Sequence, residues 1–531
     1  MKLKLLLVPC DYRNPNTREP IGGPRTPPLS IATLTAHLRG QWFKVDQDDL
    51  EIKVTAHNES VGPRIDLSKF SDEGRIRRFF ETGQDEDLVS LGERILQLTR
   101  TRGYDVVGLS LMNADNPSPP AVAAVIGKLI RERYGSTVLV GGHMDADTEK
   151  LLLSSGCADF GLSGDSQTAV GEINLLEFCQ SYEAGTDLRQ VSGVRYVKSG
   201  RLIEKSREYS PQGKYQITTP TFVGLPLDPY RRKLEVKVGN EIHHFQDLIL
   251  PYFFMRGCPY ECAFCNLSRA PLLNIKDPEE VASELKEMSR EYRTRHFFFH
   301  NPLINPTFRF ADAFAREIIR QDVSIRWTDC ASVAGMNRDL LANLKEAGAV
   351  RLVFGFESAS SRILRFINKP FTVERGSEVI RTAHERGIWT ELELICGFPS
   401  ERDADTAATV DFLEKNQQHI MACILHKFWM DGLIKDSPAR YGIRYAKRKD
   451  LKTDWLTFEW EEVGGLGYRA RVEQTNRAYE QIRAVVENLF VRTPGVHELF
   501  VYCEDRRRWD ILKEEVRFRQ ALRACQQGDR D

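Results

Sequence analysis

Residues 253–266 read Phe-Phe-Met-Arg-Gly-Cys-Pro-Tyr-Glu-Cys-Ala-Phe-Cys-Asn, which places Cys258, Cys262 and Cys265 on one short loop. The loop follows an apolar run that begins at Leu248 and precedes a predicted helix. A structural zinc site wants four ligands, and no Cys or His lies near enough in the sequence to be an obvious fourth. A four-iron four-sulfur cluster needs one ligand per iron, so three cysteines leave one iron open to a small molecule. The spacing therefore favours an iron–sulfur cluster over zinc.

A regular series of strand-like and helix-like segments follows the cysteine loop. Apolar runs, each preceded by an amphipathic stretch, occur at residues 297–299, 325–328, 351–354, 391–395 and 422–428. Repeated units of this kind close into a TIM-like barrel, complete or partial, with the active site at the carboxyl ends of its strands. We expect this barrel to occupy residues 247–428, with the cysteines at its mouth.

A second alternating series lies upstream of the barrel. Strand-like runs at residues 2–8, 105–111, 137–140 and 158–162, with a weaker one at Glu51–Thr55, are separated by helical patterns. Strands that alternate with helices predict a mostly parallel, doubly wound sheet. The predicted fold class is therefore α/β, with a Rossmann-like domain over residues 1–188 before the barrel.

The remaining segments read as a linker and a tail. Residues 189–246 contain a hairpin-like Val194–Glu204, with Ser199-Gly200 at its turn, and then a proline-rich run. Residues 429–531 form a C-terminal extension that contains Trp455, Phe458, Trp460 and Tyr468 before a charged end. We expect these aromatic side chains to form a cap over the substrate.

Composition narrows the function classes. The chain has 531 residues, 41% hydrophobic content and a formal net charge of -1, so it lacks the positive field that nucleic-acid binding usually needs. The apolar run at the N-terminus is too short for a signal peptide or membrane span, which predicts a soluble, cytoplasmic protein. Eight of the eleven cysteines are scattered singly and read as buried thiols; Cys330, at a strand end, reads as packing in preference to a hydrogen donor.

The Cys-x3-Cys-x2-Cys loop, with Phe264 just before its last cysteine, resembles the radical S-adenosylmethionine (SAM) superfamily. The resemblance implies a [4Fe–4S] cluster on Cys258, Cys262 and Cys265, whose open iron chelates the amino and carboxylate groups of SAM. An external donor such as flavodoxin or ferredoxin would reduce the cluster, and cleavage of the sulfonium would release a 5′-deoxyadenosyl radical. Phe264 is implied to contact SAM.

Two later segments resemble further SAM motifs of the superfamily. Residues 355–360, followed by Asn368-Lys369, look like the fourth-strand motif and imply SAM contacts by Glu357 and Ser358. Residues 394–401 resemble the fifth-strand adenine motif and imply contacts by Ile395 and Gly397. The second strand ends at Asn301, where relatives often carry an acidic pair; Asn301 is the expected SAM contact there.

The N-terminal domain resembles the cobalamin-binding domain of one large class of radical SAM enzymes. The resemblance rests on the Pro27-Pro28-Leu29 helix start, the 225–230 linker and the strand-end loops, and it implies cobalamin contacts by Ser110, Leu111, Met112, Gly141, Gly142, Gly164 and Asp165. On spacing alone, ordinary strand-to-helix turns explain these loops slightly better than a cobalamin site does. The Asp-x-His-x-x-Gly signature is absent, which implies that the lower face of cobalt is open or water-bound, and His143 reads as a loop residue.

Together these resemblances imply a methyltransferase. Its radical would remove hydrogen from an unactivated carbon of a small-molecule, lipid or peptide substrate bound between the domains, and methylcobalamin would supply the methyl group. Two other radical SAM activities stay open: cyclisation or rearrangement with cobalamin in another role, and methylthiotransfer, which normally comes with a cysteine-rich N-terminal domain not seen here.

Overall fold

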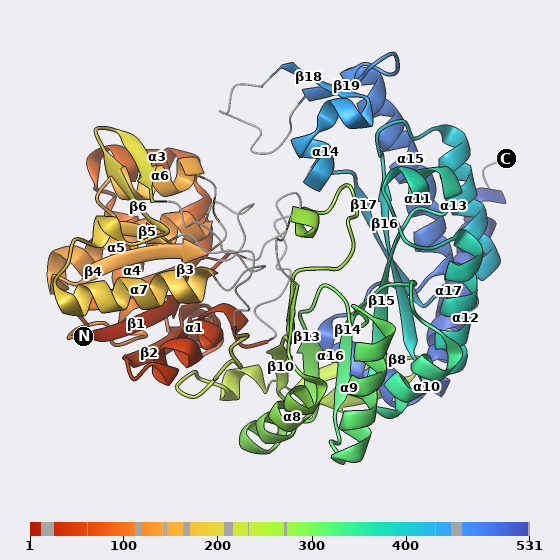
Figure 1. Ribbon diagram of the computed structural model, residues 1–531, viewed down its shortest axis with the longest axis horizontal. Helices are drawn as coiled ribbons and strands as arrows, with labels where there is room; N and C mark the ends of the chain where they lie inside the picture. Colours follow the sequence, from red (N-terminus) through yellow and green to blue (C-terminus); the bar gives the residue numbers. More distant parts are fainter. Residues whose placement is uncertain are drawn as a thin grey trace. The chain divides into compact units, whose positions relative to one another are not determined.

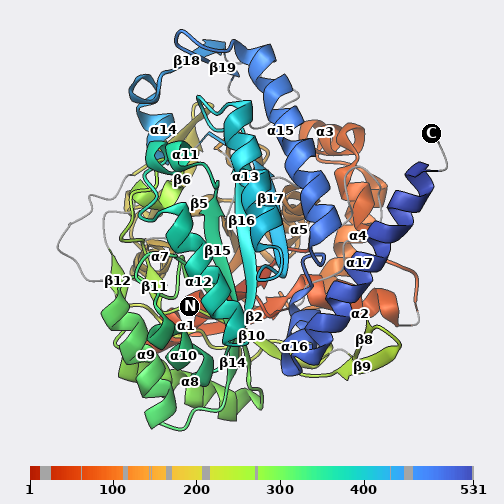
Figure 2. The same ribbon diagram turned by 90° about the vertical axis from the view of Figure 1, so that its right-hand side faces the viewer.

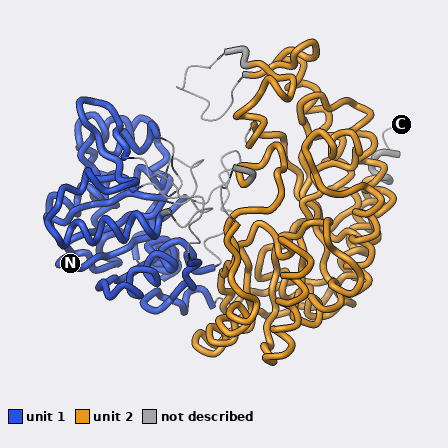
Figure 3. Tube along the Cα trace, viewed as in Figure 1, with its two compact units in different colours: residues 1–232 blue, residues 233–531 orange. Residues whose placement is uncertain are grey.

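The computed structural model describes residues 1–11, 26–60, 62–111, 118–142, 144, 146–162, 170–205, 216–231, 233–269, 273–430, 432–447 and 459–528. The chain divides into two compact units, Met1–Arg232 and Lys233–Asp531 (Figure 3). Both units combine a parallel sheet with covering helices, as the predicted α/β class requires (Figure 1). The segment 189–246, expected as a linker, is divided between the two units.

The first unit contains a seven-stranded sheet in the order β2-β1-β3-β4-β5-β6-β7. Its strands are β1 (Lys2–Leu7), β2 (Lys44–Asp49), β3 (Val106–Leu111), β4 (Thr137–Gly142), β5 (Phe160–Leu162), β6 (Val194–Lys198) and β7 (Arg201–Glu204). The first five are parallel, and the β6–β7 hairpin adds an antiparallel edge. Because the strand order reverses between β1 and β3, the unit is doubly wound.

Helices cover both faces of this sheet. They are α1 (Leu29–Gly40), α2 (Leu50–Glu59), α3 (Glu73–Thr82), α4 (Glu86–Gln97), α5 (Ser118–Tyr134), α6 (Ala146–Ser154) and α7 (Val170–Ala184). Helices α2 to α6 share one apolar core with the inner face of β1, β3 and β4, while α1 and α7 pack together against the sheet from the other side. The strands are buried on both faces, which explains their nearly continuous apolar sequence.

The weak second strand expected at Glu51–Thr55 was wrong. These residues lie in helix α2, and the second strand is the more polar segment Lys44–Asp49. The Asp49 carboxylate accepts a hydrogen bond from the backbone N–H of Ile52 at 3.0 Å and so caps the helix. The alternating polar and apolar pattern of residues 51–55 is typical of a strand, but the cap determines the helix start.

Asp49 also connects helix α2 to the last residues of the first unit. Its side chain is fully buried, and it accepts a hydrogen bond from the hydroxyl of Tyr230 in the 225–230 segment. Burial raises the pKa of Asp49 to about 6, although the hydrogen bonds from Tyr230 and Ile52 lower it. The folded chain therefore holds this proton at a pH where the unfolded chain has released it.

Replacing Asp49 with Asn is expected to remove a pH dependence of stability. A carboxyl with a raised folded-state pKa stabilises the fold below about pH 4 and loses that contribution as the pH rises to about 6, which amounts to up to about 3 kcal/mol. Asn still caps the helix and has no charge to bury. Denaturant unfolding of both proteins between pH 4 and 7 tests this, since the difference isolates Asp49. A difference that is constant with pH would contradict it.

The second unit is built on a six-stranded parallel sheet in the order β10-β13-β14-β15-β16-β17. The strands are β10 (Ile249–Tyr252), β13 (His296–Phe299), β14 (Arg326–Ala331), β15 (Ala349–Glu357), β16 (Trp389–Cys396) and β17 (Ala422–Lys427). Each strand pairs with the next one in sequence order, which is the arrangement of a partial barrel. All six carboxyl ends therefore meet at one edge.

Helices lie on the outer side of these strands (Figure 2). They are α8 (Pro278–Tyr292), α9 (Phe308–Arg320), α10 (Arg338–Glu346), α11 (Ser361–Phe366), α12 (Val373–Glu385) and α13 (Asp403–Asn416). Asp277 caps α8 by accepting from the N–H of Glu279 at 2.9 Å, and Pro278 occupies its first position. One aromatic cluster packs in stacked and edge-on pairs between α9 and the first strands of the barrel; it consists of Phe254, Phe299, Phe314 and Trp327.

The C-terminal extension packs against the barrel at both the carboxyl and the amino ends of its strands. Its elements are α14 (Gly432–Asp436), β18 (Ile443–Lys447), β19 (Glu459–Glu462), α15 (Tyr468–Leu489), α16 (Val496–Glu504) and α17 (Arg507–Gly528). Helices α16 and α17 pack with the hairpin β8 (Leu234–Val238) and β9 (Glu241–Phe245) against the amino ends of β15, β16 and β17. Among the described helices, none has the length and apolar character needed to cross a membrane.

Candidate functional site

The three clustered cysteines lie on the segment that leaves strand β10. This segment forms a two-residue antiparallel ladder between β11 (Met255–Arg256) and β12 (Asn274–Ile275), so the chain runs out from the barrel edge and returns to it. Gly257 has a φ of 79°, which favours glycine and turns the chain into Cys258. All three cysteines are half-buried with free thiols.

Neighbouring elements fasten this loop at three backbone positions. The N–H of Ala263 donates to the carbonyl of Ile367 at 2.9 Å, and the Asn368 side chain donates to the carbonyl of Glu261 at 2.9 Å. On the other side, the N–H of Ile434 in α14 donates to the carbonyl of Ala263 at 2.9 Å. The loop is therefore held in shape by the segment after β15 and by the C-terminal extension.

A half-buried lysine lies beside the cysteines. Lys369 pairs with Glu357 at 2.9 Å and donates to the carbonyl of Gly355 at 2.8 Å, and its ammonium lies 5.7 Å from the centre of the Phe264 ring. Burial raises the pKa of each of the three thiols, that of Cys258 to about 11, whereas the Lys369 ammonium lowers all three. Because a thiolate ligand has lost its proton, a nearby cation favours the ligating form.

The loop fits a cluster better than a single metal ion. Among the described residues, no three His, Cys, Asp or Glu side chains converge in a way that could hold one ion. In a four-iron cluster each thiolate binds a different iron atom, so the three thiolates need not converge on one point. The finding therefore counts against a single zinc ion and not against a four-iron cluster. The partly exposed cysteines and the adjacent half-buried Lys369 cation suit an anionic, three-thiolate cluster with one accessible iron.

Strand β15 ends in an unusual backbone conformation. Glu357 is buried and has a φ of 64°, a region that residues other than glycine rarely adopt, and the register with β16 shifts between Gly355 and Glu357. A Cβ on Gly355 would lie 3.0 Å from the Glu357 carboxylate. Ser358, which follows, is also buried. Such strain persists only where surrounding contacts hold it, and here the ion pair with Lys369 does so.

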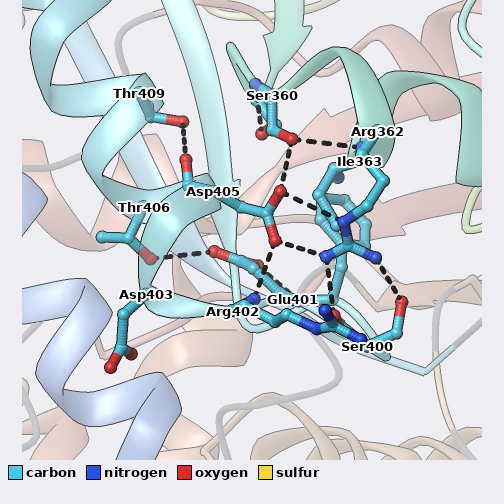
Figure 4. Close-up of polar contacts among 12 residues, drawn as sticks. Ser360, Arg362, Ile363, Ser400, Glu401, Arg402, Asp403, Asp405, Thr406 and Thr409 are labelled. Carbon is cyan, nitrogen blue, oxygen red and sulfur yellow. Dashed lines mark hydrogen bonds and ion pairs between the residues drawn. The ribbon is translucent and has the colours of Figure 1, made fainter.

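A polar network joins the loops after β15 and β16 (Figure 4). Asp405 at the start of α13 accepts from the hydroxyl of Ser360 at 2.5 Å and pairs with Arg362, which also donates to the Ser400 carbonyl at 2.7 Å. Burial alone would raise the pKa of Asp405, but the hydrogen bonds from Arg362 and Ser360 hold it below its usual range. The two predicted SAM motifs are thus joined through Asp405, which binds Ser360, and its partner Arg362, which binds Ser400.

The loop after β16 folds around Glu401. The Glu401 carboxylate accepts from the N–H groups of Gly397 at 2.7 Å and Phe398 at 2.9 Å, and burial raises its pKa. Gly397 has a φ of 91°, and a Cβ there would lie 2.5 Å from Thr475, so only glycine fits. The Phe398 ring packs edge-on against Phe264 at 5.5 Å, next to half-buried Ile395. The predicted SAM residue Phe264 of the cysteine loop therefore contacts the loop that contains Gly397.

Asn301, like Glu357, is a predicted SAM residue whose side-chain polar atoms bind other residues of the chain. Its side-chain oxygen accepts from the N–H of Phe254 at 2.9 Å, and its amide donates to Asp329 at 2.8 Å. Asp329 is fully enclosed, and burial raises its pKa well above the usual range. Asn301 therefore links the start of the cysteine segment to strands β13 and β14. Asp329 was missed from the sequence, where a single acidic residue after an apolar run gave too weak a signal.

In the first unit, the described residues that are predicted to contact cobalamin lie at the carboxyl ends of β3 and β4. The strand order reverses between β1 and β3, next to them. Ser110 and Leu111 end β3, and Gly141 and Gly142 end β4 beside them. Gly142 has a φ of 109°, and a Cβ there would lie 2.1 Å from the carbonyl of Leu111, so this position requires glycine. Gly141 has a regular φ, and its Cβ would meet nothing closer than 3.4 Å. Ligands of doubly wound sheets bind at this edge.

Several predicted residues cannot be placed. Met112, Gly164, Asp165 and His143 lie outside the described residues, as do Trp455 and Phe458 of the expected aromatic cap. Of the remaining cap residues, Trp460 packs edge-on against Phe428 at 5.9 Å, at the carboxyl end of β17. Cys330 is half-buried at the end of β14, and burial raises its pKa.

Comparison with known families identifies the barrel. Residues 252–413, which run from the last residue of β10 into α13, match the Radical SAM superfamily. The chain is 25% identical over 417 residues to an uncharacterized methyltransferase of Pyrococcus horikoshii, covering 78% of each chain. It is 31% identical over 153 residues to an anaerobic magnesium-protoporphyrin IX monomethyl ester cyclase of Cereibacter sphaeroides, covering 28% of this chain and 25% of that one.

Two solved structures share the fold across both units. The radical SAM methyltransferase TsrM from Kitasatospora setae, solved with a tryptophan substrate and a SAM analogue, superposes with a TM-score of 0.60 at 16% identity, covering 94% of this chain and 92% of that one. The cobalamin-dependent radical enzyme OxsB, solved with aqua-cobalamin and SAM, gives 0.54 at 17% identity, covering 80% of this chain and 53% of that one. At these identities the likeness shows the fold, and the predicted architecture is confirmed.

Proposed function

We propose that this protein, a radical SAM enzyme through its residues 252–413, is a cobalamin-dependent methyltransferase that acts on an unactivated carbon of a small-molecule, lipid or peptide substrate. The observation that carries the proposal is the fixed three-cysteine loop at the carboxyl edge of the barrel, joined in one chain to a doubly wound unit. The relative named as a methyltransferase, which aligns over most of both chains, supports the choice of reaction.

In this proposal Cys258, Cys262 and Cys265 hold the cluster, and the β15 and β16 loops hold SAM. When bound, the cluster and SAM supply a 5′-deoxyadenosyl radical, and methylcobalamin supplies the methyl group. The Lys369–Glu357 pair keeps a cation next to the cysteines, and the apolar contact between Phe264 and Phe398 excludes water beside them. The chain's part is to orient its ligands and keep solvent away, because homolytic steps need no general base.

The first unit supplies a suitable edge for cobalamin. Its strand order reverses next to β3, and two consecutive glycines end the neighbouring strand, so the backbone there can approach a large flat ligand. OxsB and TsrM, which share this fold, were solved with cobalamin, and this supports the assignment. With the signature histidine absent from the sequence, we propose a cobalt whose lower face is open or water-bound.

A cobalamin-using cyclase or rearrangement enzyme is the second candidate. The relative named as an anaerobic magnesium-protoporphyrin IX monomethyl ester cyclase favours it, because its 31% identity is the higher of the two identities reported above. That alignment spans about a quarter of each chain, whereas the methyltransferase relative spans 78%. Coverage therefore favours methyl transfer.

The fate of the SAM methyl group tests the proposal. Anaerobically reconstituted protein, supplied with hydroxocobalamin, a reductant and methyl-tritiated SAM, is expected to place tritium on cobalamin and to form 5′-deoxyadenosine in the presence of a cell extract that contains substrate. Formation of 5′-deoxyadenosine without labelled cobalamin would favour the cyclase. Absence of both products would contradict radical SAM activity itself.

A further inference from the structure

The C-terminal extension holds the loop formed by residues 397–401, here named the β16 loop. Strand β19 places Glu462 so that its carboxylate accepts from the N–H of Ser400 at 2.7 Å. The same carboxylate lies 3.3 Å from the guanidinium of Arg471 in α15. A charged pair from outside the barrel therefore contacts the loop that follows its fifth parallel strand in sequence.

Arg471 directs its guanidinium at the backbone of this loop. Only 2% of the residue is exposed, and it donates to the carbonyls of Phe398 and, at 3.2 Å, Glu401. Its guanidinium also lies 5.6 Å from the centre of the Trp460 ring. Burying an arginine carries a large desolvation cost, which lowers its pKa, and that cost is offset only where the donors find well-placed acceptors. Here two of those acceptors are main-chain oxygens of the β16 loop.

The β16 loop depends on such outside contacts because its backbone is strained. Ser400 has a φ of 63°, a left-handed conformation that is unfavourable for serine, and Gly397 has a φ of 91°. Glu401 satisfies the N–H groups at the start of the loop, and its own N–H donates to the carbonyl of Phe398 at 3.0 Å. The N–H of Ser400 is satisfied by Glu462, and Arg471 adds a second donor to the carbonyl of Phe398. Strained backbone persists where its surroundings over-determine it.

We propose that Glu462 and Arg471 are positioning residues for SAM: they touch no cofactor, but they hold the β16 loop in the shape that receives the adenine end. The proposal rests on the proposed function, which assigns this loop to SAM. The C-terminal extension would then be a determinant of SAM affinity. The loop that it holds also reaches the cysteine loop, because Phe398 contacts Phe264 next to Cys265.

The test compares Glu462→Ala and Arg471→Lys with the matched control Glu461→Ala. Glu461 precedes Glu462 on β19 and pairs with exposed Arg444 on β18, away from the β16 loop. Equilibrium dialysis of cluster-loaded protein is expected to show SAM binding weakened about ten-fold in both test variants and unchanged in the control, as expected for lost charge-assisted hydrogen bonds. Saturating SAM should restore the wild-type EPR signal of the reduced cluster and the wild-type rate of 5′-deoxyadenosine formation.

The outcomes separate this inference from the proposed function. If the wild-type protein carries a cluster but binds no SAM, the proposed function fails. If wild type binds SAM and the folded test variants bind it as tightly as Glu461→Ala does, the positioning role is wrong. Should one test variant fail to fold, the other decides. Glu462→Gln keeps an acceptor for the N–H of Ser400, so it is expected to bind SAM nearly as tightly as wild type, and a loss of about ten-fold in this variant would overturn the hydrogen-bonding role.

Discussion

Anaerobically purified Cys262→Ala protein is expected to hold no stable [4Fe–4S] cluster and to form no detectable 5′-deoxyadenosine. Each iron of a cubane needs its own ligand, and this loop has three thiolates for the three irons that SAM does not take. Cys262 has no substitute, because the residues around it are held by backbone hydrogen bonds at Glu261 and Ala263. Iron and sulfide analysis, the visible absorbance of the cluster and product chromatography measure the effect.

Cys423→Ala is the matched control for that loss. Cys423 lies in the same unit, is buried, and belongs to β17 near the amino end of the barrel. Its removal deletes a small buried group and leaves every cysteine of the loop in place, so cluster content should equal that of wild type. Equal iron content in Cys262→Ala and Cys423→Ala would contradict the assignment of Cys262, and zinc in the wild-type protein would contradict the cluster.

Gly141→Val is expected to abolish methyl transfer while leaving SAM cleavage intact. The glycine ends β4 at the edge where we propose cobalamin binds, and its φ suits any residue. A Cβ there meets nothing closer than the Leu162 carbonyl at 3.4 Å, which is an ordinary van der Waals contact. The added methyl groups would occupy space needed by the ligand, weakening cobalamin binding by about ten-fold or more. Absorbance titration with hydroxocobalamin measures the binding.

Gly40→Val provides the comparison for this variant. Gly40 ends helix α1, and a Cβ there would meet no atom within 4 Å. The two variants therefore make the same chemical change in the same unit, one at the proposed ligand edge and one elsewhere. Similar cobalamin affinity in both would argue against a ligand at the carboxyl ends of β3 and β4, and would leave the cluster assignment unaffected.

The sequence predicted the architecture well because parallel strands buried on both faces are almost continuously apolar. The run at 105–111 matches β3 to within one residue, the run at 351–354 lies within β15, and the Ser199-Gly200 hairpin formed as expected. It failed at Glu51–Thr55, where local alternation suggested a strand but a buried aspartate cap started a helix. It also gave no hint that the hairpin would extend the first sheet, since edge pairing depends on tertiary contacts.

The sequence predicted the motifs of the site, but it did not predict the residues that hold those motifs in place. Glycines and cysteines stand out because their backbone freedom or ligand chemistry is specific, as at Gly397 and Cys258. The residues that hold them in place are ordinary arginines and carboxylates far apart in the sequence. Arg362 and Asp405, or Glu462 and Arg471, carry no local signal, and only the fold brings them together.

The packing of α16 and α17 against the β8–β9 hairpin has a consequence for biosynthesis. Val236 and Val238, near the start of the second unit, share a core with Trp509 and Val516, and the N–H of Gly239 donates to Glu515 at 2.9 Å. Translation proceeds from the N-terminus, so the base of the barrel lacks these partners until helix α17 has left the ribosome. A chain truncated before residue 509 therefore leaves Val236 and Val238 without their core partners, and it should unfold at a lower denaturant concentration than the 531-residue chain.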